Sequence, residues 1–277
     1  MVGDQLLKLF SAQIITKKSF SCDIIDVFIS KICSTWTRGV AVGVKNLFFV
    51  CILLSSKMFA YTGVVWIGKT PVKIIRENKA PTEKTFVHLH ENETTALQAA
   101  RQFVQKNGGT LITLEHGGTR NIQFELQGKQ YAVDPNRIFT DRGITHSLQQ
   151  YSSYSLVAHQ AVKKLAQAIL AQIPPGKVVA VHNNSTYSLR DYLPGHPMHS
   201  DAKAVNYLAQ TNYRNFYFVT RQHEYERLKA LDFNVALQSN HSDDDGSLSY
   251  YLGRHNYINI ESGYGELKAQ LNMLYHA

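Results

Sequence analysis

Short apolar runs and amphipathic runs alternate along the chain from residue 61 to its end. The apolar runs are rich in β-branched and aromatic residues, which predicts strands. These predicted strands cover residues 64–68, 72–75, 85–90, 110–114, 122–126, 178–182, 216–220, 234–238 and 257–261. The amphipathic runs predict helices over residues 93–107, 154–173, 201–210, 222–231 and 264–275.

Strands that alternate with helices predict an α/β fold, in which a central mixed, largely parallel sheet is flanked by helices. Residues 61–277 are enough for one domain of this kind. Two long segments rich in turn-forming residues, 183–200 and 239–249, interrupt the pattern. Segments of this length in a compact domain commonly frame a site.

Residues 1–60 are interpreted as an N-terminal extension ahead of the domain. Within it, residues 44–60 combine Lys45, a short apolar run and a small residue at the end, as a signal peptide does. The apolar run is too short for a transmembrane helix, and a buried core segment is the alternative interpretation. We expect the translation start to lie near residue 40, and the product to be periplasmic or secreted if the host is bacterial. No stable membrane span is expected after cleavage.

Charge and cysteine content narrow the kinds of site that the domain can hold. The whole chain has a formal charge of +8, but residues 61–277 contribute 22 Lys/Arg and 18 Asp/Glu, hence only +4. No run of basic residues marks a nucleic-acid surface, so nucleic acid is not expected as a partner. Cys22, Cys33 and Cys51 all precede the domain. Any metal in the domain must therefore be held by His and carboxylate side chains.

Candidate ligands occur where predicted strands end. His90 and Glu93 are spaced His-x-x-Glu at a strand-to-helix junction, and imidazole nitrogen with carboxylate oxygen suits zinc. A surface His beside a Glu at a helix start is the alternative, and His88 is a competing ligand. His182 closes the strand 178–182, at the end where open α/β sheets bind ligands. The alternative for His182 is a bond to a loop carbonyl.

Two further segments carry groups that could act on a substrate. Asn136 and Arg137 lie in a turn after Asp134-Pro135, and Arg binds carboxylates through paired hydrogen bonds. A turn whose Arg pairs with a surface acid is the alternative. Glu261 closes the strand 257–261, where burial would raise the pKa of its carboxyl and suit a general base. The alternative is a cap for the helix that follows.

The order His-x-x-Glu, Asn-Arg, His, Glu resembles the zinc carboxypeptidase superfamily, including its aspartoacylase and succinylglutamate desuccinylase branch. HENE at 90–93 is similar to the His-Gly-Asn-Glu of the acylases, with Glu91 where they carry Gly. DPNRIF at 134–139 is similar to their Asp-x-Asn-Arg-x-Phe. The resemblance runs from about residue 85 to about residue 265.

This resemblance implies that residues 61–277 form a zinc-peptidase-like catalytic domain that hydrolyses an amide bond next to a free carboxylate. It implies one Zn²⁺ per chain. The implied roles are zinc ligand for His90, Glu93 and His182, general base for Glu261, carboxylate binding for Asn136 and Arg137, and oxyanion stabilisation for Arg120.

Three functions are compatible with these residues. The first is a carboxypeptidase acting on peptides or cell-wall peptides, which an exported location favours. The second is an N-acyl-amino-acid deacylase of the aspartoacylase type. The third is a non-catalytic binding protein on the same fold, which would keep Arg137 but bind no stoichiometric zinc. The expected partner is a peptide or an N-acyl amino acid with a free carboxylate.

Overall fold

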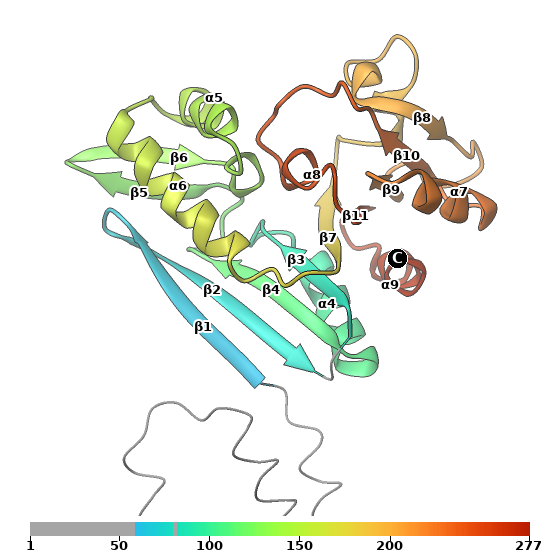
Figure 1. Ribbon diagram of the computed structural model, residues 1–277, viewed down its shortest axis with the longest axis horizontal. Coiled ribbons are helices and arrows are strands. Elements are labelled where there is room, and N and C mark those ends of the chain that lie inside the picture. The colour runs from blue at the N-terminus through green and yellow to red at the C-terminus, as the bar shows by residue number, and fades with distance from the viewer. Residues whose placement is uncertain (1–58, 80–81) are drawn as a thin grey trace, which may run out of the picture. The chain divides into compact units, whose positions relative to one another are not determined.

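The structure is a computed structural model that describes residues 59–79 and 82–277 (Figure 1). The predicted extension, with its signal segment 44–60, lies outside the described residues except for Phe59 and Ala60, which begin the first strand. In the described part of the chain, no helix combines the length and apolar character needed to cross a membrane.

Eleven strands are described, nine of them in one sheet and two in a separate hairpin. The strands are β1 Phe59–Ile67, β2 Thr70–Lys79, β3 Lys84–His88, β4 Gly109–Glu115, β5 Ile122–Leu126, β6 Lys129–Val133, β7 Lys177–Asn184, β8 Ala202–Asn206, β9 Phe216–Val219, β10 Val235–Gln238 and β11 Tyr257–Gly263. The α-helices are α4 Thr94–Asn107, α5 Asp141–Tyr151, α6 Leu156–Leu170, α7 Gln222–Ala230, α8 Leu248–Tyr251 and α9 Leu267–His276. Three short 3-10 helices cover Pro135–Arg137, Leu189–Tyr192 and His199–Asp201.

The large sheet is mixed, as predicted, and its centre is parallel. Its strand order is β1-β2-β4-β3-β7-β11-β9-β10-β8. β4, β3, β7 and β11 pair in parallel, as do β9 and β10. The other pairs, β1 with β2, β2 with β4, β11 with β9 and β10 with β8, are antiparallel. The carboxyl ends of β3, β7 and β11 therefore meet at one edge of the sheet, where ligands bind in this class of fold.

Helices cover both faces of the sheet because successive strand residues point to opposite faces. In β7, Val178 and Ala180 join the core cluster that includes Leu165 of α6. Val179 and Val181 join the cluster that includes α4 and α9 side chains. Figure 1 shows α6 lying across one face of the sheet, with α4 and α9 on the other. All-apolar strands of this kind are the mark of a sheet buried on both faces.

The predicted helix over 201–210 is wrong, because β8 occupies residues 202–206 and pairs antiparallel with β10. Ala202 and Val205 pack against a small core cluster that includes Phe218. Helix propensity in this alanine-containing segment is overridden by strand pairing and side-chain packing. The other four predicted helices are present with shifted ends. All nine predicted strands are also present: β5 has the predicted bounds, and the ends of the others are shifted, with β3 ending at His88 and not at residue 90.

Helix α5 has no counterpart in the prediction, and its sequence contains Gly143. A Cβ atom at Gly143 would lie 2.2 Å from Cα of Gly246 and 2.7 Å from the carbonyl oxygen of Arg137. Gly143 is therefore required for close backbone contact and does not end the helix. Gly246 itself has φ +74°, a conformation that favours glycine, and its carbonyl accepts a bond of 2.9 Å from the Phe139 amide. These contacts fix the segment 239–249 against the Arg137 turn.

Candidate metal centre and its cavity

Three buried side chains converge at the carboxyl edge of the sheet. His90 and Glu93 lie in the turn between β3 and α4, and His182 lies near the end of β7. Nδ1 of His90 is 3.0 Å from Oε1 of Glu93 and 3.2 Å from Nδ1 of His182. Nδ1 of His182 is 3.0 Å from Oε2 of Glu93. The sequence-predicted metal ligands are thus brought together, and each is at most 2% exposed.

The alternative interpretations of this segment do not hold. Glu93 occupies the N-cap position of α4, but its side chain makes no capping bond and is directed at the two histidines. His88 is turned away, with Nδ1 on the Thr113 hydroxyl at 3.1 Å and Nε2 on the Glu93 carbonyl at 3.0 Å. Burial lowers the pKa of His88 to about 4, so it is neutral and structural.

The donor set fits a zinc ion. Ligand atoms about 2.0–2.2 Å from a tetrahedral zinc ion lie about 3.3–3.5 Å from one another. The two histidine Nδ1 atoms lie 3.2 Å apart, and each lies 3.0 Å from one oxygen of the Glu93 carboxylate, which is close to this spacing. Despite burial, Glu93 and Asp134 raise the pKa of His90 to about 9, which shows that the cluster favours a positive charge. A bound cation would supply that charge in place of the proton.

Asp134 orients the His90 ring. Its Oδ1 accepts a bond of 2.8 Å from Nε2 of His90, which leaves Nδ1 as the nitrogen that faces Glu93 and His182. Despite burial, the His90 contact holds the pKa of Asp134 well below its usual range. A carboxylate behind a ligating histidine fixes the ring and raises its basicity. The prediction did not assign this role, and its only signal in the sequence is the Asp of the DPNR turn.

Asn183 holds Glu93 from the other side. Its backbone amide donates to Oε2 of Glu93 at 3.1 Å. Its side-chain oxygen accepts from the Ala96 amide in α4 at 2.8 Å, and its side-chain nitrogen donates to Gln270 of α9 at 3.0 Å and to the Ser262 carbonyl at 3.3 Å. One residue therefore connects the Glu93 carboxylate to two helices and to β11.

Arg120 reaches the cluster from the loop between β4 and β5. Its Nη1 lies 2.5 Å from Oε1 of Glu93. Glu91 holds this loop, because its carboxylate accepts from the backbone amides of His116 at 2.6 Å and Gly118 at 2.8 Å. The β5–β6 hairpin separates Arg120 from the Asn-Arg turn. This contact places Arg120 beside the candidate metal ligands.

Glu261 lies on β11, directly opposite His182 in the parallel ladder with β7. It is 6% exposed and accepts bonds from the side-chain amides of Asn184 at 3.2 Å and Asn259 at 3.0 Å. Burial raises the pKa of this carboxyl. Glu261 does not cap α9, whose N-cap residue is Glu266. The position suits a group that accepts and returns a proton.

Asn136 and Arg137 lie in the short 3-10 helix that follows Asp134. The Asn136 side-chain oxygen accepts from the Leu248 amide at 3.0 Å, which leaves its NH₂ group for other partners. Arg137 pairs with an acid, as the alternative interpretation expected, because its Nη1 lies 3.4 Å from Oδ2 of Asp245. Both members of this pair line a cavity.

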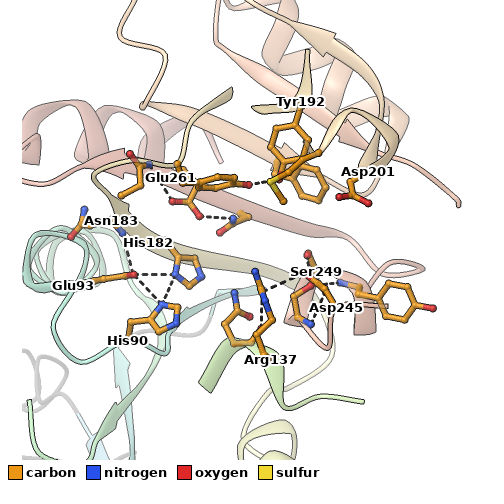
Figure 2. Close-up of a pocket in the computed structure, with 18 of the residues that line it drawn as sticks. His90, Glu93, Arg137, His182, Asn183, Tyr192, Asp201, Asp245, Ser249 and Glu261 are labelled. Atoms are coloured by element: carbon orange, nitrogen blue, oxygen red, sulfur yellow. Dashed lines mark hydrogen bonds and ion pairs between the residues drawn. The ribbon is translucent and has the colours of Figure 1, made fainter. Parts of the chain in front are cut away.

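That cavity has a volume of about 730 Å³ and is bordered by all seven predicted site residues. Figure 2 labels His90, Glu93, Arg137, His182 and Glu261 among them. The two long segments 183–200 and 239–249 supply much of its wall, as expected from the sequence. The prediction placed neither Tyr187 nor Tyr192 there, although their hydroxyls bond to each other in the wall. Only their position in a long loop could have indicated this. Arg190 lies in the same segment as these two tyrosines but does not line the cavity, and its guanidinium stacks on the Tyr213 ring.

No protein-family model matches the chain, and no curated protein matches it. Among solved structures, it is similar to an aspartoacylase family protein from Mesorhizobium loti, with 17% identity, a TM-score of 0.40, and coverage of 80% of this chain and 67% of that one. It is also similar to a metallo-carboxypeptidase from Burkholderia cenocepacia, with 13% identity, a TM-score of 0.42, and coverage of 83% and 67%. At these identities the activity has to be inferred from the side chains of this chain.

Proposed function

We propose that the chain is a zinc-dependent hydrolase of an amide bond next to a free carboxylate, acting as a carboxypeptidase on peptides or cell-wall peptides. The observation that carries the proposal is the convergence of His90, Glu93 and His182 within 3.0–3.2 Å, in a cavity that also contains a buried carboxylate and a guanidinium. The two-His-one-Glu set is typical of hydrolytic zinc sites.

In this proposal His90, Glu93 and His182 hold the metal. Zinc in such a site supplies Lewis acidity towards the scissile carbonyl and lowers the pKa of water to about 7. Glu261 accepts the proton of the attacking water and passes it to the leaving nitrogen. Its burial and raised pKa suit this exchange, because a carboxyl that is too acidic returns a proton poorly.

The two arginines act at different points of the substrate. Arg137, assisted by Asn136, binds the free carboxylate and so positions the adjacent amide bond. Arg120 lies against Glu93 at the ligand cluster, where it donates to the carbonyl oxygen as negative charge develops on it. Loss of such a donor typically costs about 10²–10³-fold in turnover.

The first test is metal content together with turnover, on the full chain purified with added zinc. The expected result is one zinc per chain and hydrolysis of N-acyl dipeptides that a chelator stops. A panel of N-acyl dipeptides, cell-wall peptides and N-acyl amino acids, read by mass spectrometry, separates a peptidase from a deacylase. A chain that binds no zinc and hydrolyses nothing in the panel would contradict the proposal and favour a binding protein.

The second test is Glu261→Gln, which keeps the shape of the side chain and removes the base. It should leave zinc content unchanged and lower kcat by about 10²–10⁴-fold. Glu83→Gln is the matched control, because Glu83 is an exposed carboxylate just before β3, at the end of that strand away from the cavity. Near-normal turnover by Glu261→Gln would show that another group is the base.

The third test concerns the free carboxylate. Arg137→Ala should reduce kcat/KM on substrates with a free carboxylate and have little effect on their amidated counterparts. Equal losses on both would exclude the proposed carboxylate contact. Export of the protein stays a prediction, which cell fractionation followed by detection of the protein in each fraction would test.

A further inference from the structure

The part of the cavity beyond Arg137 is acidic. Asp201, Asp243 and Asp245 all line it, and Figure 2 shows Asp201 and Asp245 across the pocket from the zinc-ligand cluster. Arg137 offsets one of these three charges through its 3.4 Å contact with Asp245. Two formal negative charges remain in excess. The Asp201 carboxylate accepts one long bond, 3.4 Å from the Asp243 amide, so it is poorly satisfied within the chain.

Buried oxygen atoms without partners line the same cavity. Among the residues that the structure describes, Oε1 of Gln238, Oδ1 of Asn259 and the hydroxyl of Tyr257 have no hydrogen-bond partner. These residues are only 9%, 8% and 0% exposed, respectively. The Asn259 orientation is fixed because its NH₂ donates to Glu261 at 3.0 Å. Amide oxygens only accept hydrogen bonds, and leaving them unpaired in a buried site is costly.

A ligand that carries only a carboxylate does not satisfy this arrangement. It would gain the Arg137 contact but meet the charges of Asp245 and its neighbours, and it would donate nothing to the amide oxygens. A ligand with a carboxylate and a cationic donor group would pair the carboxylate with Arg137 and the cationic group with the aspartates and the amide oxygens. Burial, together with the charges of Asp245 and Asp243, raises the pKa of Asp201, so a nearby cation would relieve this repulsion.

The walls of this region suit the stem of such a group. Tyr192 stacks on Phe218 at 5.1 Å between ring centroids, and Met198 lies beside them in the lining. Apolar walls that lead to acidic groups match a methylene chain that ends in a charge.

We infer that the substrate residue whose free carboxylate binds Arg137 carries an ammonium or guanidinium group on its side chain. Asp201 and Asp245 bind that cationic group. The substrate class is thus a peptide or acyl derivative that ends in lysine, arginine or a related diamino acid. This inference deepens the proposed function: it rests on that function for turnover, but not for binding.

Binding of free amino acids to the full zinc-loaded chain tests the inference without turnover. The probes are lysine, arginine, diaminopimelate and norleucine, in both enantiomers where available, measured by calorimetry. Norleucine is the matched control, because it has the lysine stem without the ammonium group. At least one of the cationic amino acids should bind ten times or more tighter than norleucine. Norleucine binding as tight as the best cationic probe overturns the inference.

Charge removal in the pocket gives a second readout. Asp201→Asn and Asp245→Asn should each reduce the preference for the cationic probe over norleucine by about fivefold or more. Asp232→Asn is the matched control, because Asp232 is exposed in the turn after α7 and Asn also accepts its φ of +57°. An unchanged preference in both pocket variants overturns the inference.

Turnover separates this inference from the proposed function. N-acyl dipeptides ending in lysine, arginine or norleucine should be hydrolysed with kcat/KM in favour of the cationic residues. Hydrolysis with equal or better rates on norleucine overturns the inference and leaves the proposed function standing. Selective binding of a cationic amino acid without hydrolysis of any substrate supports the inference and removes the proposed function.

Discussion

Asp134→Asn should weaken zinc binding by about 2- to 30-fold, a magnitude that follows from its contact with His90. The 2.8 Å bond joins a carboxylate that is 6% exposed to a ring that is 2% exposed, so solvent screens it little. A hydrogen bond to a charged group is worth about 1.5–3 kcal/mol and a neutral one about 1 kcal/mol. The substituted amide would retain the neutral bond, so the loss is about 0.5–2 kcal/mol, and each 1.4 kcal/mol corresponds to about tenfold in affinity.

The assay is competition for zinc between the full chain and a fluorescent chelator at neutral pH. The substituted side chain also retains an acceptor for the Asn136 amide, which the carboxylate binds at 2.7 Å, so the turn should keep its shape. Asp232→Asn, with the same change of charge at an exposed position, should bind zinc like the wild type. If Asp134→Asn binds zinc within twofold of the wild type, Asp134 does not support the ligand, and the reasoning fails.

Three further predictions concern stability and positioning. Gly246→Ala should lower the free energy of unfolding by about 2–4 kcal/mol in urea titrations, because φ +74° disfavours a side chain and the added Cβ would meet Gly143 Cα at 2.4 Å; an unchanged midpoint would contradict this. The pKa of Glu224 is lowered: burial opposes ionisation, but the bonds from Lys177 and Arg227 outweigh it. Its stabilisation is therefore present above pH 4.5 and is lost as the pH falls through its folded pKa, so Glu224→Gln should flatten the acid side of a stability-against-pH curve. Glu91→Gln should reduce kcat while zinc content stays at one per chain, because the loop that carries Arg120 loses its charged anchor; equal kcat in variant and wild type would exclude that positioning role.

The sequence was most informative where strands end. His182 and Glu261 close apolar runs, and the parallel ladder of β7 with β11 makes such ends adjacent. The separation between His90 and Glu93 spans a strand-to-helix turn, so their convergence was also predictable. The ligand cluster could therefore be predicted from the positions of these residues in the sequence, because parallel strands bring their carboxyl ends to one edge of the sheet.

Features that depend on contacts between distant segments could not be predicted. The sequence of residues 201–210 favours a helix, yet residues 202–206 pair with the edge of β10 and form β8. The role of Gly143 could not be predicted, because its partner, Gly246, is about a hundred residues away in the chain. The acceptor-rich wall around Gln238 likewise arises only when β10, β11 and the 239–249 segment meet.

Asn183 has a consequence for how the metal centre is assembled. Its amide holds Glu93, while its side chain is fixed by α4 and by Gln270 of α9. Glu93 cannot move away from the two histidines without breaking its hydrogen bond to Asn183, which α4 and α9 hold in place. The ligand geometry is therefore preorganised, and little conformational entropy remains to be lost when a cation arrives. Rapid uptake with small structural change is the behaviour expected of such a centre.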